Sequence, residues 1–331
     1  MLRDLQNFLK MDSLQSSYNC VVLLGPTAVG KTALGVRIAD FLEGEIVSAD
    51  SRQVYKGLDI GSGKDLAEYE FRGRAVPYHL IDIAELSCEY SVFLYQQDFY
   101  KAFKSILEKG KIPVIVGGTG MYLDAVIRNY DLIPVPENKE FREWAKDVPL
   151  EELGKMLLEL KGGSLHVMRD LLERERVIKA IEIEKFIQSS ECEEFKKSLE
   201  ARPEICPLVL GTTLERATLR ANIKKRLFER LDSGMIEEVE RLHSEGASWE
   251  RLEKLGLEYR FVSEFLEGKF SSKEEMAEKL NIAIGQFAKR QETWFRGMEK
   301  NGVKINWLPK IPDLDARFAA ARKFLEDANF S

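Results

Sequence analysis

The chain has 331 residues, of which 44% are hydrophobic and 31% are charged, and its formal net charge is −6. This composition is that of an ordinary globular protein, long enough for two structural units. The acidic balance excludes a surface that is basic overall, so a nucleic acid would have to be held by local basic stripes.

The four cysteines show no C-x-x-C spacing, and three histidines are too few to build a zinc cluster. The sequence therefore predicts reduced thiols in a cytoplasmic protein. Residues 1–17 mix apolar and charged side chains without an uninterrupted hydrophobic stretch. We expect neither a signal peptide nor a membrane span there.

A glycine-rich loop is the most informative feature of the sequence. Residues 25–32 read GPTAVGKT and match G-x-x-x-x-G-K-[ST], between a predicted strand at 20–24 and a predicted helix at 33–39. In such a loop the backbone amides and the helix N-terminus surround phosphate oxygens. Lys31 would reach the outer phosphates, and the Thr32 hydroxyl would hold Mg²⁺. The loop predicts a phosphate-ester site without saying which ester binds.

Strands and helices alternate after this loop. The pattern predicts a strand at 45–50, a strand at 77–83, a helix at 91–109 ended by Gly110, a strand at 113–116 and a helix at 121–127. This alternation indicates a parallel sheet covered on both faces, where ligands bind beyond the carboxyl ends of the strands. We therefore expect the glycine-rich loop, Asp50 and Thr119 to converge in space.

The chain changes character near residue 130. Charged helical segments are predicted at 141–146, 150–160 and 171–186, followed by a strand at 208–211 that completes the sheet and by helices up to residue 296. We expect an α/β fold, a P-loop NTPase-like parallel sheet flanked by helices. Its predicted parts are a first core segment at 18–129, a helical insertion at 130–201, the remaining core and C-terminal helices at 202–310, and terminal extensions at 1–17 and 311–331.

Asp50 follows the second strand and is the strongest candidate for chemistry. It would serve as a general base, as a metal-linked carboxylate or as a helix N-cap. Three classes of protein remain open at this point: a small-molecule or nucleotide kinase, a transferase that grips the diphosphate of an alkyl donor, and a nucleotide-regulated switch. Arg72 and Arg74 do not form a clear kinase lid, and the guanine-reading N-K-x-D of a switch is missing.

Five blocks of the sequence narrow this choice. They are GPTAVGKT at 25–32, DSRQVYKGLDIG at 50–61, HLIDI at 79–83, GGTGMY at 117–122 and AKRQETWFR at 288–296. In this order and spacing the set resembles the tRNA dimethylallyltransferases. The resemblance covers roughly residues 21–125 and 175–308.

The resemblance implies transfer of a dimethylallyl group from dimethylallyl diphosphate to N6 of the adenosine 3′ of the anticodon, in tRNAs that read codons beginning with U. It implies Asp50 as the base, Thr119 beside the acceptor, and Mg²⁺ at Thr32. The implied diphosphate-binding residues are Gly25, Thr27, Ala28, Gly30, Lys31, Thr32 and Arg216. The implied tRNA-binding residues are Asp50, Ser51, Arg52, Gln53, Thr119, Arg142, Glu175, Arg176, Lys179, Lys289 and Arg290.

The chain also departs from the family pattern. Asn222-Ile223 stands where the family usually has Arg-Ile, and the insertion lacks the usual D-P and T-G-K. We expect a divergent member that acts as a monomer, without a membrane partner. An isopentenyltransferase for free adenine nucleotides shares the loop and the aspartate, but the helical insertion and the basic C-terminal helices favour tRNA as the acceptor. A nucleotide or small-molecule kinase is the alternative from another class.

Overall fold

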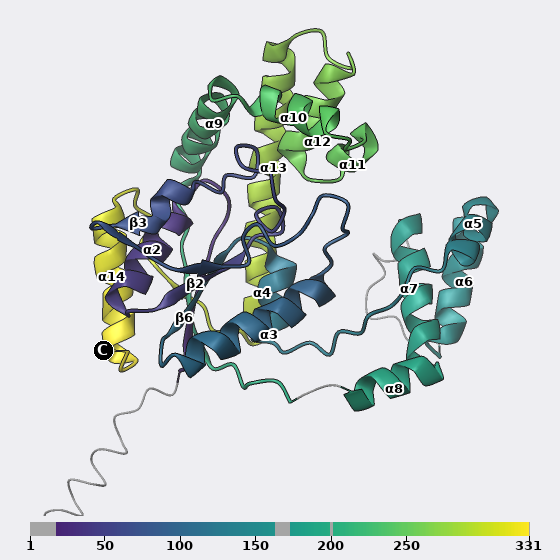
Figure 1. Cartoon of the computed structure of the whole chain (residues 1–331), viewed down its shortest axis with the longest axis horizontal. Coiled ribbons are helices and arrows are strands. Elements are labelled where there is room, and N and C mark those ends of the chain that lie inside the picture. The colour runs from purple at the N-terminus through teal and green to yellow at the C-terminus, as the bar shows by residue number, and fades with distance from the viewer. Residues whose placement is uncertain (1–17, 163–172, 199–200, 331) are drawn as a thin grey trace, which may run out of the picture. The chain divides into compact units, whose positions relative to one another are not determined.

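The computed structural model describes residues 18–162, 173–198 and 201–330 (Figure 1). The chain divides into two compact units. The smaller unit is Asp131–Arg202, and the larger one joins the segments that precede and follow it. Each helix in the described part of the chain is either too short or too polar to cross a membrane.

The larger unit is built on a six-stranded parallel sheet with strand order β5-β2-β6-β1-β7-β8. Every residue of the three strands β1, β2 and β6 is buried, as in a sheet covered on both faces. The predicted strands at 20–24, 45–50, 113–116 and 208–211 are confirmed. The six strands are β1 (Cys20–Leu24), β2 (Glu45–Ala49), β5 (Tyr78–His79), β6 (Pro113–Gly117), β7 (Pro207–Gly211) and β8 (Asn306–Trp307).

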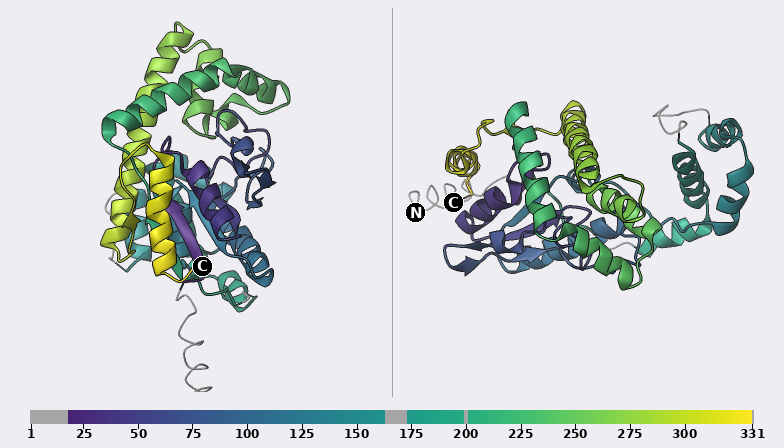
Figure 2. Two further views of the ribbon diagram at one scale, coloured as in Figure 1. Left: turned by 90° about the vertical axis from the view of Figure 1, so that its left-hand side faces the viewer. Right: turned by 90° about the horizontal axis from the view of Figure 1, so that it is seen from above.

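Helices cover the two faces of this sheet (Figure 2). Over one face, α2 (Lys31–Phe41) and α14 (Leu314–Asp327) share a core that contains Leu34, Ile38 and Leu325. Because α2 starts directly after the glycine-rich loop, the predicted strand–loop–helix unit is confirmed.

The opposite face is covered by α3 (Val92–Glu108), α4 (Gly120–Ile127) and the C-terminal part of α13 (Lys273–Lys300). Phe99, Tyr122 and Phe295 meet in their shared core. The helices predicted at 91–109 and 121–127 are confirmed. Gly110 follows α3 with a φ of +69°, the left-handed conformation that commonly ends a helix.

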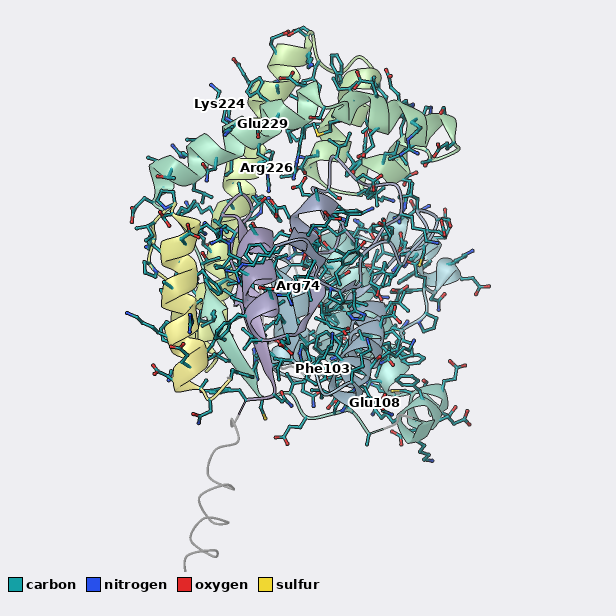
Figure 3. The ribbon with its side chains drawn as sticks, turned by 60° about the vertical axis from the view of Figure 1, so that its left-hand side comes forward. Arg74, Phe103, Glu108, Lys224, Arg226 and Glu229 are labelled. Atoms are coloured by element: carbon teal, nitrogen blue, oxygen red, sulfur yellow. The ribbon has the colours of Figure 1, made fainter. Side chains whose placement is uncertain are left out.

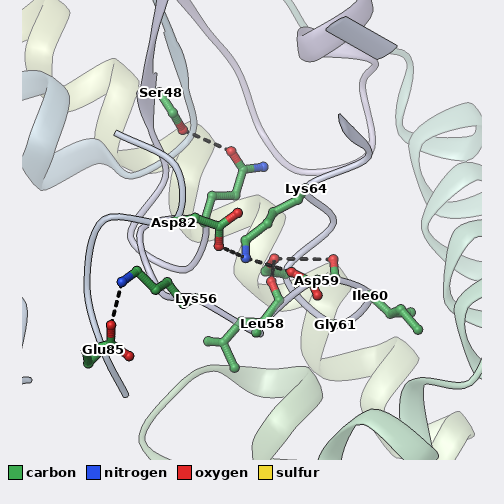
Figure 4. Close-up of polar contacts among 12 residues, drawn as sticks. Ser48, Lys56, Leu58, Asp59, Ile60, Gly61, Lys64, Asp82 and Glu85 are labelled. Carbon is green, nitrogen blue, oxygen red and sulfur yellow. Dashed lines mark hydrogen bonds and ion pairs between the residues drawn. The ribbon is translucent and has the colours of Figure 1, made fainter. Parts of the chain in front are cut away.

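The strand predicted at 77–83 is shorter than expected. Only Tyr78–His79 pairs with β2. Leu80 and Asp82 have φ angles of 64° and 55°, which turn the chain out of the extended conformation. The turn places the Asp82 carboxylate against the ammonium group of Lys64, whose side chain is only 2% exposed (Figure 4). The turn toward the buried Lys64 therefore ends the strand early.

Residues 311–331, which we expected to be a terminal extension, instead contain a core helix. Helix α14 contacts α2, and Ala321 and Leu325 on it are fully buried. This packing has no sequence signature, because α14 is held against α2, a helix far earlier in the chain.

A second core of the larger unit lies between helices of the C-terminal half and residues 54–58. The helices are α9 (Arg216–Asp232), α10 (Met235–Ser244), α11 (Trp249–Glu253), α12 (Leu257–Leu266) and the N-terminal part of α13. They enclose Val54 and Leu58 from the segment that follows β2. The glycines between these helices, Gly234, Gly246 and Gly268, all have positive φ angles.

The smaller unit consists of helices with a core of its own. They are α5 (Lys139–Asp147), α6 (Leu150–Leu160), α7 (Arg174–Ile187) and α8 (Ser190–Ser198). Phe141, Leu157 and Ile181 are buried together in this unit. The predicted helices at 141–146 and 150–160 are confirmed, whereas the first residues of the one predicted at 171–186 lie outside the described residues.

Truncation of Leu325 tests whether α14 belongs to the core. Leu325→Ala removes a fully buried side chain beside α2 and should lower the free energy of unfolding by about 2–5 kcal/mol. Thermal and urea unfolding measure the change. Lys323→Ala, an exposed change on the same helix, is the control. Equal stability of both variants and the unchanged protein would mean that α14 is not packed as described.

Candidate active site

A cavity of about 850 Å³ lies at the carboxyl ends of the central strands. Its lining residues all belong to the larger unit. The floor is formed by the glycine-rich loop and by the residues after β2 and β6, and the other walls come from α9, α12, α13 and residues 61–69. Several acidic side chains also line it, namely Asp65, Glu68, Glu229, Glu253 and Glu258. The cavity thus lies at the edge where ligands bind in open parallel sheets, beyond the carboxyl ends of the strands.

The glycine-rich loop has the shape of a phosphate cradle. Gly30 precedes α2 with a φ of 73°, a left-handed conformation that suits glycine. A Cβ on Gly25 would lie 2.2 Å from the carbonyl oxygen of Thr212, so glycine is required there too. Thr27, Ala28, Gly30, Lys31 and Thr32 all line the cavity. The backbone and the N-terminus of α2 therefore present partial positive charge to it.

Cationic side chains add further positive charge to this loop. The Lys31 ammonium group donates to the carbonyl of Pro26 at 2.5 Å, and the Arg226 guanidinium group donates to the hydroxyl of Thr27. Figure 3 shows Arg226 on the side of α9 that faces the sheet, and Lys224 pointing away from it. Among the described residues, no carboxylate lies within ion-pair distance of Lys31 or Arg226.

This crowding of positive charge changes how the groups titrate. Burial, together with repulsion from Arg226 and against the opposing attraction of Asp50, lowers the pKa of Lys31 to about 7. Burial, with repulsion from Arg230, lowers the pKa of Arg226 to about 10. An anion in the cavity would relieve both effects. The site is therefore suited to a highly charged anion such as a diphosphate.

Asp50 stands at the carboxyl end of β2 and lines the same cavity. One carboxylate oxygen, Oδ1, accepts from the backbone N–H of Arg52 at 2.9 Å. The other, Oδ2, has no hydrogen-bond partner within the part of the chain described. Asp50 is thus held in place by one oxygen and keeps the second available for a proton.

Thr119 lies next to Asp50 although it is far away in sequence. Its hydroxyl oxygen accepts from the backbone N–H of Ser51 at 3.0 Å and lies 3.3 Å from the Ser51 hydroxyl. The Thr119 N–H also donates to the carbonyl of Ala49 at 3.1 Å. The ends of β2 and β6 are therefore joined at the cavity floor, so the predicted convergence of the loop, Asp50 and Thr119 is confirmed.

Gln53 connects the strand end to the glycine segment that forms another wall. It accepts from the Ser48 hydroxyl at 2.9 Å and donates to the carbonyl of Gly63 at 3.1 Å.

The carboxylate of Glu238 accepts from three successive N–H groups, those of Asp59, Ile60 and Gly61. Lys64 donates to Asp59 at 2.8 Å (Figure 4). These contacts fix residues 59–64 in one conformation.

Helix α13 closes the cavity above the loop. The side chain of Gln291 accepts from the Thr27 N–H at 2.9 Å and donates to the carbonyl of Gly118 at 2.8 Å. Trp294 packs so closely on the turn after β6 that a Cβ on Gly120 would lie 2.5 Å from its ring. Arg290 lines the cavity, whereas Lys289 is exposed on the helix outside it.

Helix α9 places its cavity residues differently from the sequence prediction. Arg216 is the exposed first residue of α9 and does not line the cavity. Asn222, Arg226 and Arg230 do, and the Asn222 amide donates to the carbonyl of Ala28 at 3.3 Å. These three residues follow one another at intervals of four, which puts them on the same face of a helix. That spacing is the sequence pattern that identifies them as a group.

Four predicted tRNA-binding residues lie in the smaller unit. Arg142 pairs with Glu182 at 2.8 Å and with Glu137 at 2.6 Å. The Arg176 guanidinium group pairs with Glu173, and Lys179 donates to the carbonyl of Val135 at 3.3 Å. Glu175, the fourth of them, is in the first turn of α7. None of these side chains lines the cavity of the larger unit.

The fold and the site define a P-loop α/β protein with a cavity suited to an anionic phosphate ester. A family model described as IPP transferase matches residues 53–298, and one described as isopentenyl transferase matches residues 18–78. The chain belongs to the IPP transferase family.

Relatives in several bacteria are similar over most of this chain. The chain is 53% identical to tRNA dimethylallyltransferase 2 of Treponema denticola, over 90% of its own length and 98% of the relative. It is 52% identical to tRNA dimethylallyltransferase 1 of Syntrophus aciditrophicus, over 88% and 93%.

Solved structures share the fold. The tRNA isopentenylpyrophosphate transferase of Bacillus halodurans is 29% identical, with a TM-score of 0.66 over 94% of this chain and 96% of that one. A eukaryotic dimethylallyltransferase acting on tRNA has a TM-score of 0.69 at 21% identity, covering 92% and 77%.

The lowered pKa of Lys31 predicts proton uptake when an anion binds. At pH 8 the free amine is mostly neutral because its pKa is about 7, and inorganic diphosphate should restore its charge. Titration calorimetry at pH 8, in buffers of different ionisation enthalpy, should detect the proton. The affinity should fall by up to about tenfold per pH unit above 7.

Lys31→Arg is the matched control, because arginine remains charged throughout this pH range. The variant should lose the Lys31 contribution to proton uptake and the corresponding pH dependence. Equal proton uptake by Lys31→Arg and the unchanged protein would contradict a titrating Lys31.

Proposed function

We propose that this protein transfers a dimethylallyl group from dimethylallyl diphosphate to N6 of the adenosine 3′-adjacent to the anticodon, in tRNAs that read codons beginning with U. The products are N6-isopentenyladenosine and diphosphate. One observation carries the proposal: a single cavity holds a phosphate cradle with unpaired cations and, at the next strand end, a carboxylate with an available oxygen. The names of the relatives support it.

In the proposed reaction the bond between the allylic carbon and the diphosphate oxygen breaks, and a bond from N6 to that carbon forms. The N6 lone pair is delocalised into the purine ring, so the nitrogen is a weak nucleophile until a proton leaves. Oδ2 of Asp50 takes that proton. The departing diphosphate gathers negative charge, which the Gly30 amide, Lys31 and Arg226 stabilise.

The neighbours of Asp50 have orienting roles in this proposal. Thr119 and Ser51 hold each other at the acceptor side of the cavity. Ser51, Arg52 and Gln53 then contact the target adenosine, which must leave its stack in the anticodon loop to reach Asp50. Oxygen and nitrogen donors on these side chains suit the polar edge of an adenine.

The residues present fit a Mg²⁺ ion that is held chiefly by the substrate. No cluster of three or more His, Cys, Asp or Glu side chains suitable for a metal occurs among the described residues. Mg²⁺ usually keeps several waters and binds one or two protein oxygens together with substrate phosphates. The Thr32 hydroxyl, which lines the cavity, would supply such an oxygen. A Mg²⁺ bound there would neutralise part of the diphosphate charge.

We propose that the smaller unit and α13 hold the tRNA around its anticodon stem-loop. Arg142, Glu175, Arg176 and Lys179 belong to the smaller unit, and Lys289 and Arg290 to α13. Lysine and arginine contacts to phosphates fix the register of a nucleic acid. We also propose that the protein acts as a monomer and, because tRNA is the proposed substrate, that it acts in the cytoplasm.

The direct assay offers labelled dimethylallyl diphosphate to an anticodon stem-loop RNA and to AMP in parallel. Nuclease digestion and mass spectrometry then identify the modified nucleoside. We expect N6-isopentenyladenosine in the RNA and little transfer to AMP. Equal or preferred transfer to AMP would support the free-nucleotide alternative, and ATP turnover without prenyl transfer would support a kinase.

Substitution of Asp50 tests the proposed base. Asp50→Asn keeps the size of the side chain but removes the group that accepts the proton, so the rate of transfer should fall by about 10²–10⁴-fold. Binding of the RNA, measured by filter retention, should change little. Asp315→Asn, at an exposed ion pair with Arg37, is the matched control. The role of Asp50 as the base would be refuted if Asp50→Asn bound the RNA poorly but transferred the dimethylallyl group at the normal rate in every complex that formed.

A further inference from the structure

An arginine from the C-terminal helix lies directly behind the phosphate loop. Arg317 of α14 is 4% exposed. Its Nη1 atom donates to the carbonyl of Val29 at 2.6 Å and to the hydroxyl of Thr212, after β7, at 3.2 Å. Figure 2 shows α14 in yellow alongside the purple segments of β1 and α2, which the loop joins. Arg317 therefore connects three elements at the base of the loop.

The charge of Arg317 is not neutralised by an ion pair. No carboxylate among residues 18–162, 173–198 and 201–330 lies within ion-pair distance of it. Burial lowers its pKa, with Asp313 acting in the opposite direction. Arg322 on the same helix differs, since it is exposed and pairs with Glu326 at 2.7 Å. Burying a charge without an ion-pair partner lowers the stability of the fold. A charged arginine at this position, behind the loop, therefore points to a functional role.

Peptide geometry relates Arg317 to the cavity. The Val29 carbonyl and the Gly30 N–H belong to one peptide group, which is trans because the described chain has no cis peptide bond. In a trans peptide these two groups point in opposite directions. With the carbonyl held by Arg317, the N–H points away from α14.

The Gly30 N–H is available to a ligand in this orientation. Gly30 lines the cavity, and no acceptor for its N–H is present in the described part of the protein. A Cβ built on Gly30 would lie 3.5 Å from Nη2 of Arg317, so the guanidinium group lies against this residue. The arginine and the cavity thus lie on opposite sides of one peptide group.

We propose that Arg317 is a positioning residue for the diphosphate. It fixes the Val29–Gly30 peptide so that the Gly30 amide faces the ligand, and it places a positive charge behind the loop. The inference rests on the proposed function for the identity of the ligand. It gives α14, a helix outside every sequence motif of the site, a part in donor binding.

The test measures binding of inorganic diphosphate to the full chain by titration calorimetry. Arg317→Met removes both the charge and the hydrogen bonds and should weaken binding by about tenfold to hundredfold. Arg317→Lys keeps the charge but replaces the planar guanidinium group by a single nitrogen on a shorter, flexible stem, so it should bind with an affinity between those of Arg317→Met and the unchanged protein. Thr212→Val should cause a smaller loss, and Arg322→Met is the control that should cause none.

Transfer kinetics separate positioning from a purely structural role. Arg317→Met should raise the KM for dimethylallyl diphosphate by a similar factor while kcat changes by less than about threefold, since the Asp50 side of the cavity is untouched. If Arg317→Met does not fold, Arg317→Lys and Thr212→Val provide the same comparison. Diphosphate affinities equal to that of the unchanged protein in all folded variants would overturn the proposal.

The two proposals fail in different ways. If the unchanged protein did not bind inorganic diphosphate at all, the proposed function itself would be wrong. If the unchanged protein and Arg317→Met bound it equally well, only the role of Arg317 would be rejected. Reduced binding by Arg317→Met with partial recovery in Arg317→Lys supports the inference.

Discussion

Positive charge gathered around one short loop is the feature on which the site depends. Lys31 and Arg226 reach the loop from the cavity side, and Arg317 contacts it from behind. None of the three has a carboxylate at ion-pair distance in the described residues, so the protein carries an electrostatic cost that a diphosphate would remove. Such preorganised charge is effective in catalysis because it needs no rearrangement when the leaving group develops its own charge.

The parallel sheet supplies the second requirement, which is a base near that charge. Because β1, β2 and β6 run in the same direction, their carboxyl ends bring the loop, Asp50 and Thr119 to one floor. The second core, formed by α9 to α13 with Val54 and Leu58, holds the roof of the cavity over that floor. The donor and acceptor sites thus share one rigid frame, which favours a reaction governed by the positions of the reacting groups.

The sequence was sufficient for the features that depend on local patterns. Short signatures mark the glycine-rich loop, the strand-end residues Asp50 and Thr119, and the strands predicted at 20–24, 45–50, 113–116 and 208–211, and all of these were placed correctly in the fold. Arg216 was expected at the diphosphate from the family resemblance, which does not fix the face on which the helix packs, and Arg226 lines the cavity while Arg216 does not. Arg317 had no signature at all, since its partner Val29 is 288 residues away.

The central claim is that the glycine-rich loop receives the diphosphate of the prenyl donor while Asp50 faces the acceptor. A crystal structure with an unreactive thio analogue of dimethylallyl diphosphate tests it most directly. We predict both phosphorus atoms beside residues 25–32, with phosphate oxygens bound by the Gly30 amide and Lys31 and the allylic carbon directed toward Asp50. Phosphorus atoms bound elsewhere in the protein would contradict the account.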